Sequence, residues 1–259
     1  MKSEKKVAIV TGGASGIGKA TAQLFGSLSY DLVVADIDVA GGEAVVEEIN
    51  AADLGRATFV STDLSAAGDI SKLVEISMEI HGRIDVLHNN AGLLFVRKSL
   101  EDVDTSEWDR LIAVMLTGTF LATKAVFPIM RQQGGGLIVN TSSRVAWTPL
   151  EWGIPYATVK AGLLGFSRSV AALGRPHNIR CNAICPGAVK TALQRESPKE
   201  ILDDLDRQGW LDPAEVAQII HYFIENPSAT GEEILTEMRN GRPLYFRSRP
   251  TLFEEFSLG

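Results

Sequence analysis

The sequence contains little cysteine and no excess of basic residues. Only two of its 259 residues are cysteines, Cys181 and Cys185, and a C-x-x-x-C pair by itself lacks the four ligands of a zinc site. We expect no metal site and two buried free thiols in a reducing cytoplasm. The 25 basic residues are outnumbered by 32 acidic ones, so the net charge is −7. Without a basic block we expect neither nucleic acid nor a membrane as a partner, which favours a small-molecule role.

Long hydrophobic runs and interdomain linkers are also lacking. The N-terminal MKSEKKVAIVTGG has four consecutive apolar residues, too few for the core of a signal peptide. The most membrane-like window, residues 111–130, is interrupted by threonines, a lysine and a proline, and we interpret it as a helix buried on most sides. No repeat or linker divides the chain. We predict one domain over residues 1–259, with an irregular segment at about 188–211 and a divergent tail at about 239–259.

Short strand-like runs alternate with longer helical patterns along the chain. The runs lack polar alternation, which is typical of parallel strands buried on both faces. They are KKVAIVT (5–11), DLVVAD (31–36), ATFVST (57–62), IDVLHN (84–89), GLIVNTS (136–142) and NIRCNAI (178–184). The pattern predicts an α/β fold with helices on both faces of a parallel sheet. A helix over 105–131 is predicted to begin at a capping box of Asp104 and Glu107 and to end at glycines 134–136.

A glycine-rich segment, TGGASGIGKA, follows the first strand-like run. Such a turn lets backbone N–H groups and a helix N-terminus approach a phosphate. Gly13, Gly18 and Lys19 fit the start of a nucleotide triphosphate loop. The next residue, Ala20, lacks the hydroxyl that such a loop offers to magnesium, which disfavours an NTPase.

The same segment also fits a dinucleotide turn made by Gly12, Gly16 and Gly18. Asp36 supports this interpretation, because a carboxylate at the end of the second strand can bind a ribose diol and repel a 2′-phosphate. Asp36 also resembles the magnesium-binding aspartate of an NTPase. The glycines alone therefore leave the choice of nucleotide open.

Tyr156 and Lys160 are one helical turn apart in the segment YATVK. Side chains at i and i+4 lie on the same face of a helix, so the phenol and the ammonium can meet. By itself the pair indicates little, because this spacing occurs by chance on many helices.

Five motifs follow one another along the chain and together carry more information than any one alone. They are the turn T-G-x-x-x-G-x-G, NNAG at 89–92, Ser143, YATVK at 156–160 and PGAVKT at 186–191. In this order the chain, from about residue 5 to about residue 224, resembles the short-chain dehydrogenase/reductase family. The resemblance implies a doubly wound, Rossmann-type sheet of about seven parallel strands, NAD(P), and hydride exchange between an alcohol and a carbonyl.

The resemblance also implies which residues bind the cofactor. The glycine turn would approach the pyrophosphate, Asp36 the adenosine ribose, and the 186–191 segment the nicotinamide. The implied residues are Gly12, Ser15, Gly16, Ile17, Gly18, Asp36, Asp63, Leu64, Asn90, Ala91, Gly92, Tyr156, Lys160, Pro186, Gly187, Val189 and Thr191. Because Asp36 is acidic and Ser15 is not basic, we predict that NAD(H) is preferred over NADP(H).

Ser143, Tyr156 and Lys160 are the catalytic residues that the resemblance implies. Reduction of a ketone by hydride produces an alkoxide, and a phenol with a reference pKa of about 10 releases its proton reluctantly near neutral pH. The positive charge of Lys160 would lower the pKa of Tyr156, and Ser143 would orient the substrate oxygen.

The chain departs from the family pattern at three places. Met115 stands where the family usually has a helix asparagine, so proton relay from Lys160 to solvent is in question. The ending TGEEILTEMRNGRPLYF replaces the usual aspartate–glycine–glycine. The substrate-covering segment between Thr191 and Asp212 is short and charged, which predicts a partly open pocket.

We therefore predict an NAD-dependent alcohol dehydrogenase or ketone reductase that forms a homodimer or homotetramer through helices 105–131 and 155–174. A catalytically weak NAD(H)-binding regulatory protein of the same fold is the alternative. A bulky, mainly apolar substrate is expected, because six apolar residues fall in segments that flank the catalytic residues in the family. They are Leu93, Leu94, Val145, Trp147, Leu150 and Trp152.

Overall fold

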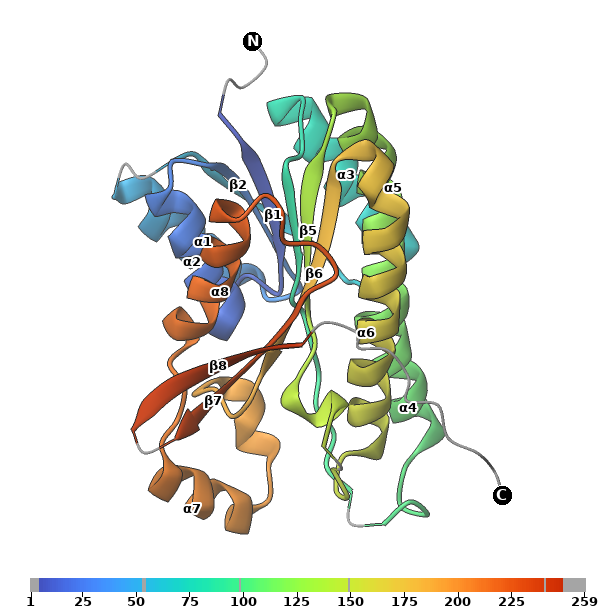
Figure 1. Cartoon of the computed structure of the whole chain (residues 1–259), viewed down its shortest axis with the longest axis vertical. Helices are drawn as coiled ribbons and strands as arrows, with labels where there is room; N and C mark the ends of the chain where they lie inside the picture. Colours follow the sequence, from blue (N-terminus) through green and yellow to red (C-terminus); the bar gives the residue numbers. More distant parts are fainter. Residues whose placement is uncertain (1–4, 53–54, 98, 149, 240, 249–259) are drawn as a thin grey trace.

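The computed structural model describes residues 5–52, 55–97, 99–148, 150–239 and 241–248, and in them one eight-stranded sheet lies between two layers of helices (Figure 1). The strand order is β3-β2-β1-β4-β5-β6-β7-β8. The strands are β1 (Val7–Thr11), β2 (Asp31–Asp36), β3 (Ala57–Ser61), β4 (Val86–Asn89), β5 (Gly136–Thr141), β6 (Ile179–Pro186), β7 (Glu233–Arg239) and β8 (Arg242–Ser248).

Neighbouring strands from β3 to β7 pair in parallel, and only β8 runs antiparallel, to β7. The six strands predicted from sequence are confirmed, as is the doubly wound α/β class. The strand order reverses between β1 and β4, and the carboxyl ends of parallel strands at such a reversal flank the crevice where ligands bind.

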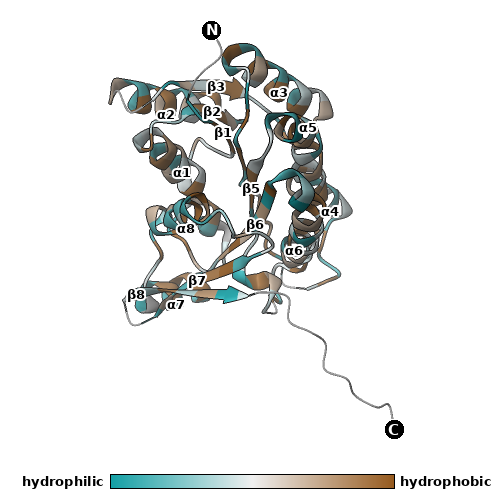
Figure 2. Cartoon of the chain, turned by 45° about the horizontal axis from the view of Figure 1, so that its top comes forward, coloured by the Kyte–Doolittle hydropathy of each residue, from teal (hydrophilic) through white to brown (hydrophobic). Residues whose placement is uncertain are grey.

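Helices cover both faces of the sheet (Figure 1). On one side lie α1 (Gly16–Ser27), α2 (Val39–Ala51) and α8 (Pro213–Glu225); on the other lie α3 (Ala67–His81), α4 (Thr105–Leu111), α5 (Gly118–Gln133) and α6 (Ile154–Gly174). Successive residues of a strand point to opposite faces of the sheet. Val10 and Val34 pack toward α1 and α8, whereas Ile9 and Val33 pack toward α3 and α5. Figure 2 shows brown, hydrophobic stretches along several of the strands and alternating brown and teal turns along the helices on either side.

The long predicted helix is divided into three parts. A six-residue π-helix, η1 (Ile112–Thr117), joins α4 to α5. The Asp104 carboxylate caps α4 by accepting the Ser106 N–H at 2.7 Å, but Glu107 pairs with Arg97, so the predicted capping box does not form. Within the described chain this is the one stretch that by length and composition could cross a membrane, at a mean hydropathy of 1.7. One third of its most apolar window is buried, so the prediction of a helix buried on most sides is wrong.

The segment predicted to be irregular contains two helical pieces. They are the 3₁₀ turn η4 (Ala192–Glu196) and the helix α7 (Lys199–Gln208). The acidic residues that made KEILDDLDR look like an open loop alternate with Ile201 and Leu205, which are one turn apart on the same helix face.

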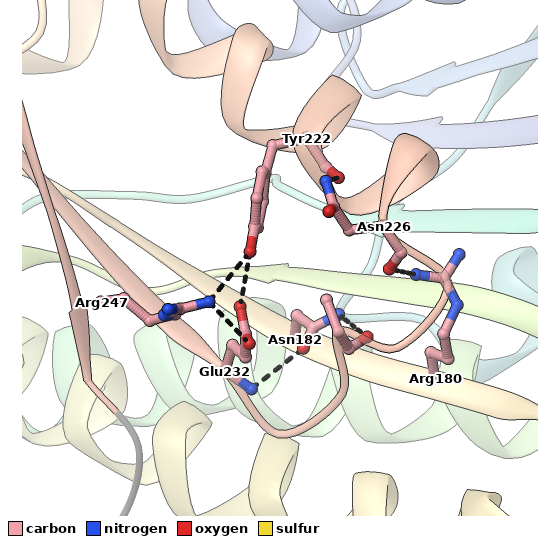
Figure 3. A network of polar contacts seen from close by, with 7 residues as sticks. Arg180, Asn182, Tyr222, Asn226, Glu232 and Arg247 are labelled. Carbon is pink, nitrogen blue, oxygen red and sulfur yellow. Dashed lines mark hydrogen bonds and ion pairs between the residues drawn. The ribbon is translucent and has the colours of Figure 1, made fainter.

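The C-terminal region is a β-hairpin up to residue 248, where a divergent tail was predicted. β8 pairs with β7 along its whole length, from Glu233 opposite Ser248 to Arg239 opposite Arg242. An Arg247 N–H group lies 3.2 Å from the Tyr222 hydroxyl of α8 and 3.4 Å from a Glu232 oxygen (Figure 3). These contacts hold the hairpin against α8; the rest of the predicted tail, 249–259, lies outside the described residues.

Cys181 and Cys185 both lie in β6 and are buried and free, as the sequence predicts. Burial raises the pKa of each thiol to about 12, which keeps it protonated near neutral pH.

Candidate active site

One cavity of about 700 Å³ extends along the carboxyl ends of the parallel strands. Sixteen of the seventeen predicted cofactor-binding residues line it, the exception being Gly18, and so does Ser143. Five of the six predicted pocket residues line it as well, namely Leu93, Leu94, Val145, Leu150 and Trp152. Residues far apart in the sequence therefore meet around one space, as the motif order predicts.

The glycine turn is shaped for close approach by a ligand. Gly12 and Gly16 have φ angles of +64° and +52°, a region that side chains disfavour. A Cβ on Gly12 would lie 2.6 Å from the Ala91 Cα, so no larger residue fits there. Ser15 precedes α1 but makes no side-chain cap, which leaves the first N–H groups of the helix for another acceptor. These features fit a dinucleotide pyrophosphate.

Gly18 has a different place from the one predicted. It is buried in α1 and does not line the cavity. A Cβ there would lie 1.9 Å from the Gly12 carbonyl oxygen and 2.7 Å from the Asn90 side-chain nitrogen. Gly18 therefore allows the helix to pack tightly on the turn instead of approaching the pyrophosphate itself.

Asp36 ends β2 at the rim of the cavity. One carboxylate oxygen accepts the Ala14 N–H at 2.9 Å, and the other accepts the Asp38 N–H at 3.0 Å. Both oxygens are thereby fixed beside the glycine turn, where each keeps a lone pair for a ribose hydroxyl.

Asn90 connects the end of β4 to the glycine turn. Its amide nitrogen donates to the Thr11 and Gly12 carbonyls at 3.1 and 3.2 Å. Its oxygen accepts the Thr141 hydroxyl at 3.3 Å. Thr141 also lines the cavity. The sequence analysis did not predict this role, because nothing in the local sequence distinguishes Thr141 from any other buried threonine of a strand.

The three predicted catalytic residues lie together. Ser143 hydrogen-bonds to Tyr156, and the Lys160 nitrogen lies 5.4 Å from the centre of the Tyr156 ring. Lys160 comes from the buried face of α6 and donates to the Thr141 carbonyl at 2.7 Å. The turn's spacing in YATVK thus places the ammonium beside the phenol, as predicted.

Burial controls the protonation of this group. It raises the pKa of Tyr156 to about 12, an increase that the hydrogen bond with Ser143 reduces. It lowers the pKa of Lys160 to about 8. The lowering of the Tyr156 pKa expected from Lys160 is not seen in this structure, where burial dominates and Ser143 opposes it.

Met115 occupies the middle of the π-helix beside the catalytic residues. Its carbonyl accepts the Thr119 hydroxyl at 2.7 Å, and its sulfur lies 3.4 Å from the Leu93 nitrogen as a weak acceptor. The Gly118 N–H reaches back five residues to the Ala113 carbonyl. The backbone is therefore widened here although the family's asparagine is absent.

The substrate end of the cavity differs from the prediction at Trp147. That ring does not line the cavity; it is 48% exposed and lies 5.8 Å from the Arg168 guanidinium. Ile201 and Leu205 of α7 line the cavity instead, together with Arg144. Sequence reasoning missed the α7 residues because it treated their segment as an irregular charged loop.

Comparison with known proteins identifies the family. Residues 6–201 match the family model for short chain dehydrogenase. The chain belongs to the short-chain dehydrogenase/reductase family. Short-chain dehydrogenases/reductases are oxidoreductases that transfer hydride with a nicotinamide cofactor, so this chain is an enzyme of that class.

Individual short-chain dehydrogenases/reductases are similar over most of this chain. The trans-4-hydroxycyclohexanecarboxylate dehydrogenase of Sinomonas cyclohexanicum is 39% identical, over 73% of this chain and 74% of its own. The 3-oxoacyl-[acyl-carrier-protein] reductase FabG of Thermotoga maritima is 35% identical, over 90% and 97%. A crystal structure of the 3-ketoacyl-(acyl-carrier-protein) reductase of Brucella melitensis with NADH superposes with a TM-score of 0.83 at 29% identity, over 90% of this chain and 97% of that one.

Proposed function

We propose that this enzyme transfers hydride between NAD(H) and a secondary alcohol or ketone with a bulky, mainly apolar skeleton. The observation that carries the proposal is a single cavity lined both by Ser143, Tyr156 and Lys160 and by the glycine turn with Asp36. The relatives support it, since one is a dehydrogenase of a cyclic hydroxy compound and one solved structure is a complex with NADH.

In this proposal the chain binds the cofactor through backbone and side-chain groups along the cavity. The N–H groups of the first turn of α1 bind the pyrophosphate beside Gly12. Asp36 binds the adenosine ribose hydroxyls and repels a 2′-phosphate. The bound nicotinamide supplies or accepts the hydride, and the protein positions the carbonyl carbon for it.

Tyr156 transfers the proton. In reduction its phenol donates to the alkoxide oxygen as that charge develops, and in oxidation its phenolate accepts the alcohol proton. Burial has raised its pKa to about 12, so a positive charge is needed to bring proton release toward neutral pH. Lys160 supplies one, because a pKa of about 8 leaves it mostly protonated at neutral pH. Ser143 donates to the substrate oxygen and orients it.

The walls of the substrate end favour apolar skeletons. Leu93, Leu94 and Trp152 come from the loops beside Tyr156, and Ile201 and Leu205 come from α7. The backbone N–H of Arg97 donates to the Trp152 carbonyl at 3.0 Å, which ties the two loops together. A methylene-rich substrate would gain about 0.8 kcal/mol for each CH₂ buried against these walls.

We further propose a cytoplasmic homodimer or homotetramer. Phe120 on α5 is 46% exposed and forms an edge-on contact with Phe166 of α6 at 6.4 Å between ring centres. An exposed aromatic side chain that packs against a half-buried one on the neighbouring helix is typical of an interface.

The substitution Tyr156→Phe tests the enzymatic proposal, because it deletes the hydroxyl and keeps the ring. Turnover of a panel of secondary alcohols and ketones should be lost, while NADH binding measured by fluorescence stays within about threefold of the parent. Retention of most of the parental rate would show that Tyr156 is not the acid and base.

A further inference from the structure

Arg144 is a charged residue of the cavity lining, next to Ser143 in the sequence, that no part of the proposed mechanism uses. From β5 to the end of α7 the described chain contributes two charged residues to the cavity lining, Lys160 and Arg144. Lys160 donates to the Thr141 carbonyl and lies beside Tyr156. The other wall residues of this region are apolar or uncharged, so a cation at Arg144 is conspicuous there.

The guanidinium of Arg144 is only loosely paired. Its side chain is 46% exposed, and its nearest acidic partner, Glu237 of β7, lies 3.9 Å away, beyond hydrogen-bond distance. The other oxygen of Glu237 is 2.7 Å from Arg239. Within the described residues, Glu237 is therefore shared by two arginines, and Arg144 keeps its donors for another acceptor.

The position of this pair is the rim of the substrate end. Arg144 directly follows Ser143, the residue proposed to orient the substrate oxygen, and both line the cavity. Glu237 lies beside Gly187, another lining residue: a Cβ on Gly187 would be 3.3 Å from the Glu237 Cβ. A group that extends from the reaction centre along this wall can therefore reach Arg144.

We propose that the substrate carries a carboxylate on its apolar skeleton, and that Arg144 binds this carboxylate and determines substrate choice. The inference rests on the proposed function, whose site it completes. A guanidinium forms two parallel hydrogen bonds to a carboxylate, and the low-polarity wall strengthens them. Glu237 tunes this binding, because it competes for the same guanidinium.

A matched pair of substrates tests the inference directly. The enzyme is assayed in the reductive direction with NADH on a cyclohexanone that bears a ring carboxylate, and on the methyl ester of the same compound. The two differ by one charge and little else. We expect kcat/KM for the acid to exceed that for the ester by about 10- to 100-fold at low salt, mostly through KM, with a smaller ratio at high salt.

Three variants separate Arg144 from a general effect of charge. Arg144→Gln should bring the ratio of acid to ester close to one, and Glu237→Gln should raise it by removing the competing carboxylate. Arg131→Gln is the control, because it removes the same charge from an exposed position of α5 that does not line the cavity. It should keep the parental ratio.

The outcomes distinguish the inference from the proposed function. If the parent reduces the ester at least as well as the acid, or if its preference for the acid survives in Arg144→Gln, the assignment of Arg144 is wrong while the enzyme remains a ketone reductase. If neither compound nor any other ketone of a broad panel is reduced by the folded parent, the proposed function itself fails.

Discussion

The imidazole Nε2 of His88 lies 2.8 Å from the Thr141 Oγ1, and both residues are buried in the central sheet. The hydroxyl of Thr141 also contacts the Asn90 side-chain oxygen, which can only accept. Thr141 has one hydroxyl proton and must give it to Asn90, so His88 has to be the donor through Nε2–H. This assigns the tautomer: Nδ1 carries no proton, and it has no partner among the described residues. A chain of donors therefore runs from His88 through Thr141 to Asn90, and from Asn90 to the glycine turn.

We predict that His88→Leu weakens NADH binding, because Thr141 loses its donor and Asn90 is held less firmly. One buried neutral hydrogen bond contributes about 1 kcal/mol, so the Kd should rise about fivefold. His88→Gln should restore much of the affinity, since an amide N–H can replace Nε2–H. Thr141→Val should weaken binding similarly, and the double variant should be no worse than either single one. Additive losses, or unchanged Kd values with a lowered Tm alone, would show that the pair only supports the sheet.

The same histidine should make the fold sensitive to acid. Burial, and secondarily the charge of Lys160, lowers the pKa of His88 to about 3. Between about pH 6.5 and about pH 3, His88 is therefore protonated in the unfolded chain and neutral in the folded chain. The folded-state pKa is depressed, so the stability is present above pH 6.5 and is lost as the pH falls through this window, at up to about 1.4 kcal/mol per pH unit. Urea unfolding at several pH values should show a shallower decline for His88→Leu; identical slopes would contradict the assignment.

The sequence predicts those parts of the site whose geometry depends on residues close together in the chain. The turn at Gly12 and Gly16 needs positive φ angles, and the helical spacing of Tyr156 and Lys160 fixes their common face, so short motifs suffice. His88 and Thr141 are 53 residues apart and meet only because β4 and β5 pair in register. The sequence of neither strand indicates that these two side chains form a polar contact.

The remaining errors arise where tertiary contacts override local composition. α7 is strongly charged, and only its packing over the cavity gives Ile201 and Leu205 their role. β8 lies in a segment that the sequence analysis predicted to be a tail. It forms a strand because the edge of β7 is available for pairing and because Arg247 contacts Glu232. The ring of Trp147 lies outside the cavity, and its centre is 5.8 Å from the Arg168 guanidinium, a contact that the sequence does not reveal.

Cofactor choice should depend on Asp36. We expect kcat/KM for NAD(H) to exceed that for NADP(H) by at least about 100-fold on one substrate, because the Asp36 carboxylate would face the 2′-phosphate. Asp36→Asn should reduce this ratio by about 10-fold or more. Asp38→Asn is the matched control: Asp38 caps α2 through the Gly41 N–H at 3.1 Å and does not line the cavity. Preference for NADP(H) in the parent would contradict the proposed cofactor.

Subunit assembly should depend on Phe120. We expect Phe120→Glu to lower the molar mass measured by light scattering, because a charge would be buried in the interface proposed between α5 and α6 of neighbouring subunits. Val39→Glu, at an apolar residue of α2 that is 45% exposed in the other helical layer, should leave the mass unchanged. A parent that is monomeric at micromolar concentration would remove the proposal of an oligomer.

The last prediction concerns Met115, which separates an enzyme from a regulatory protein of the same fold. The Met115 carbonyl already accepts the Thr119 hydroxyl, but a carbonyl oxygen has a second lone pair. The π-helix also interrupts the regular i to i−4 hydrogen bonding of the backbone at this point. A water beside Lys160 can still be accepted there. We therefore expect a working enzyme, with Met115→Asn equal to the parent in kcat or faster.

The substitution should also have a cost in stability. Met115 is buried, and its sulfur is close to the Leu93 N–H, a contact that the asparagine oxygen can replace. The amide N–H₂ group has no assured acceptor, so its burial would lower the free energy of unfolding by about 1–3 kcal/mol. Met115→Leu serves as the control, because it removes the acceptor sulfur without adding a polar group. Rates and urea unfolding must be measured on the same preparations. If the parent and a folded Met115→Asn protein both bind NADH but turn over no alcohol or ketone of a broad panel, the regulatory function replaces the enzymatic one.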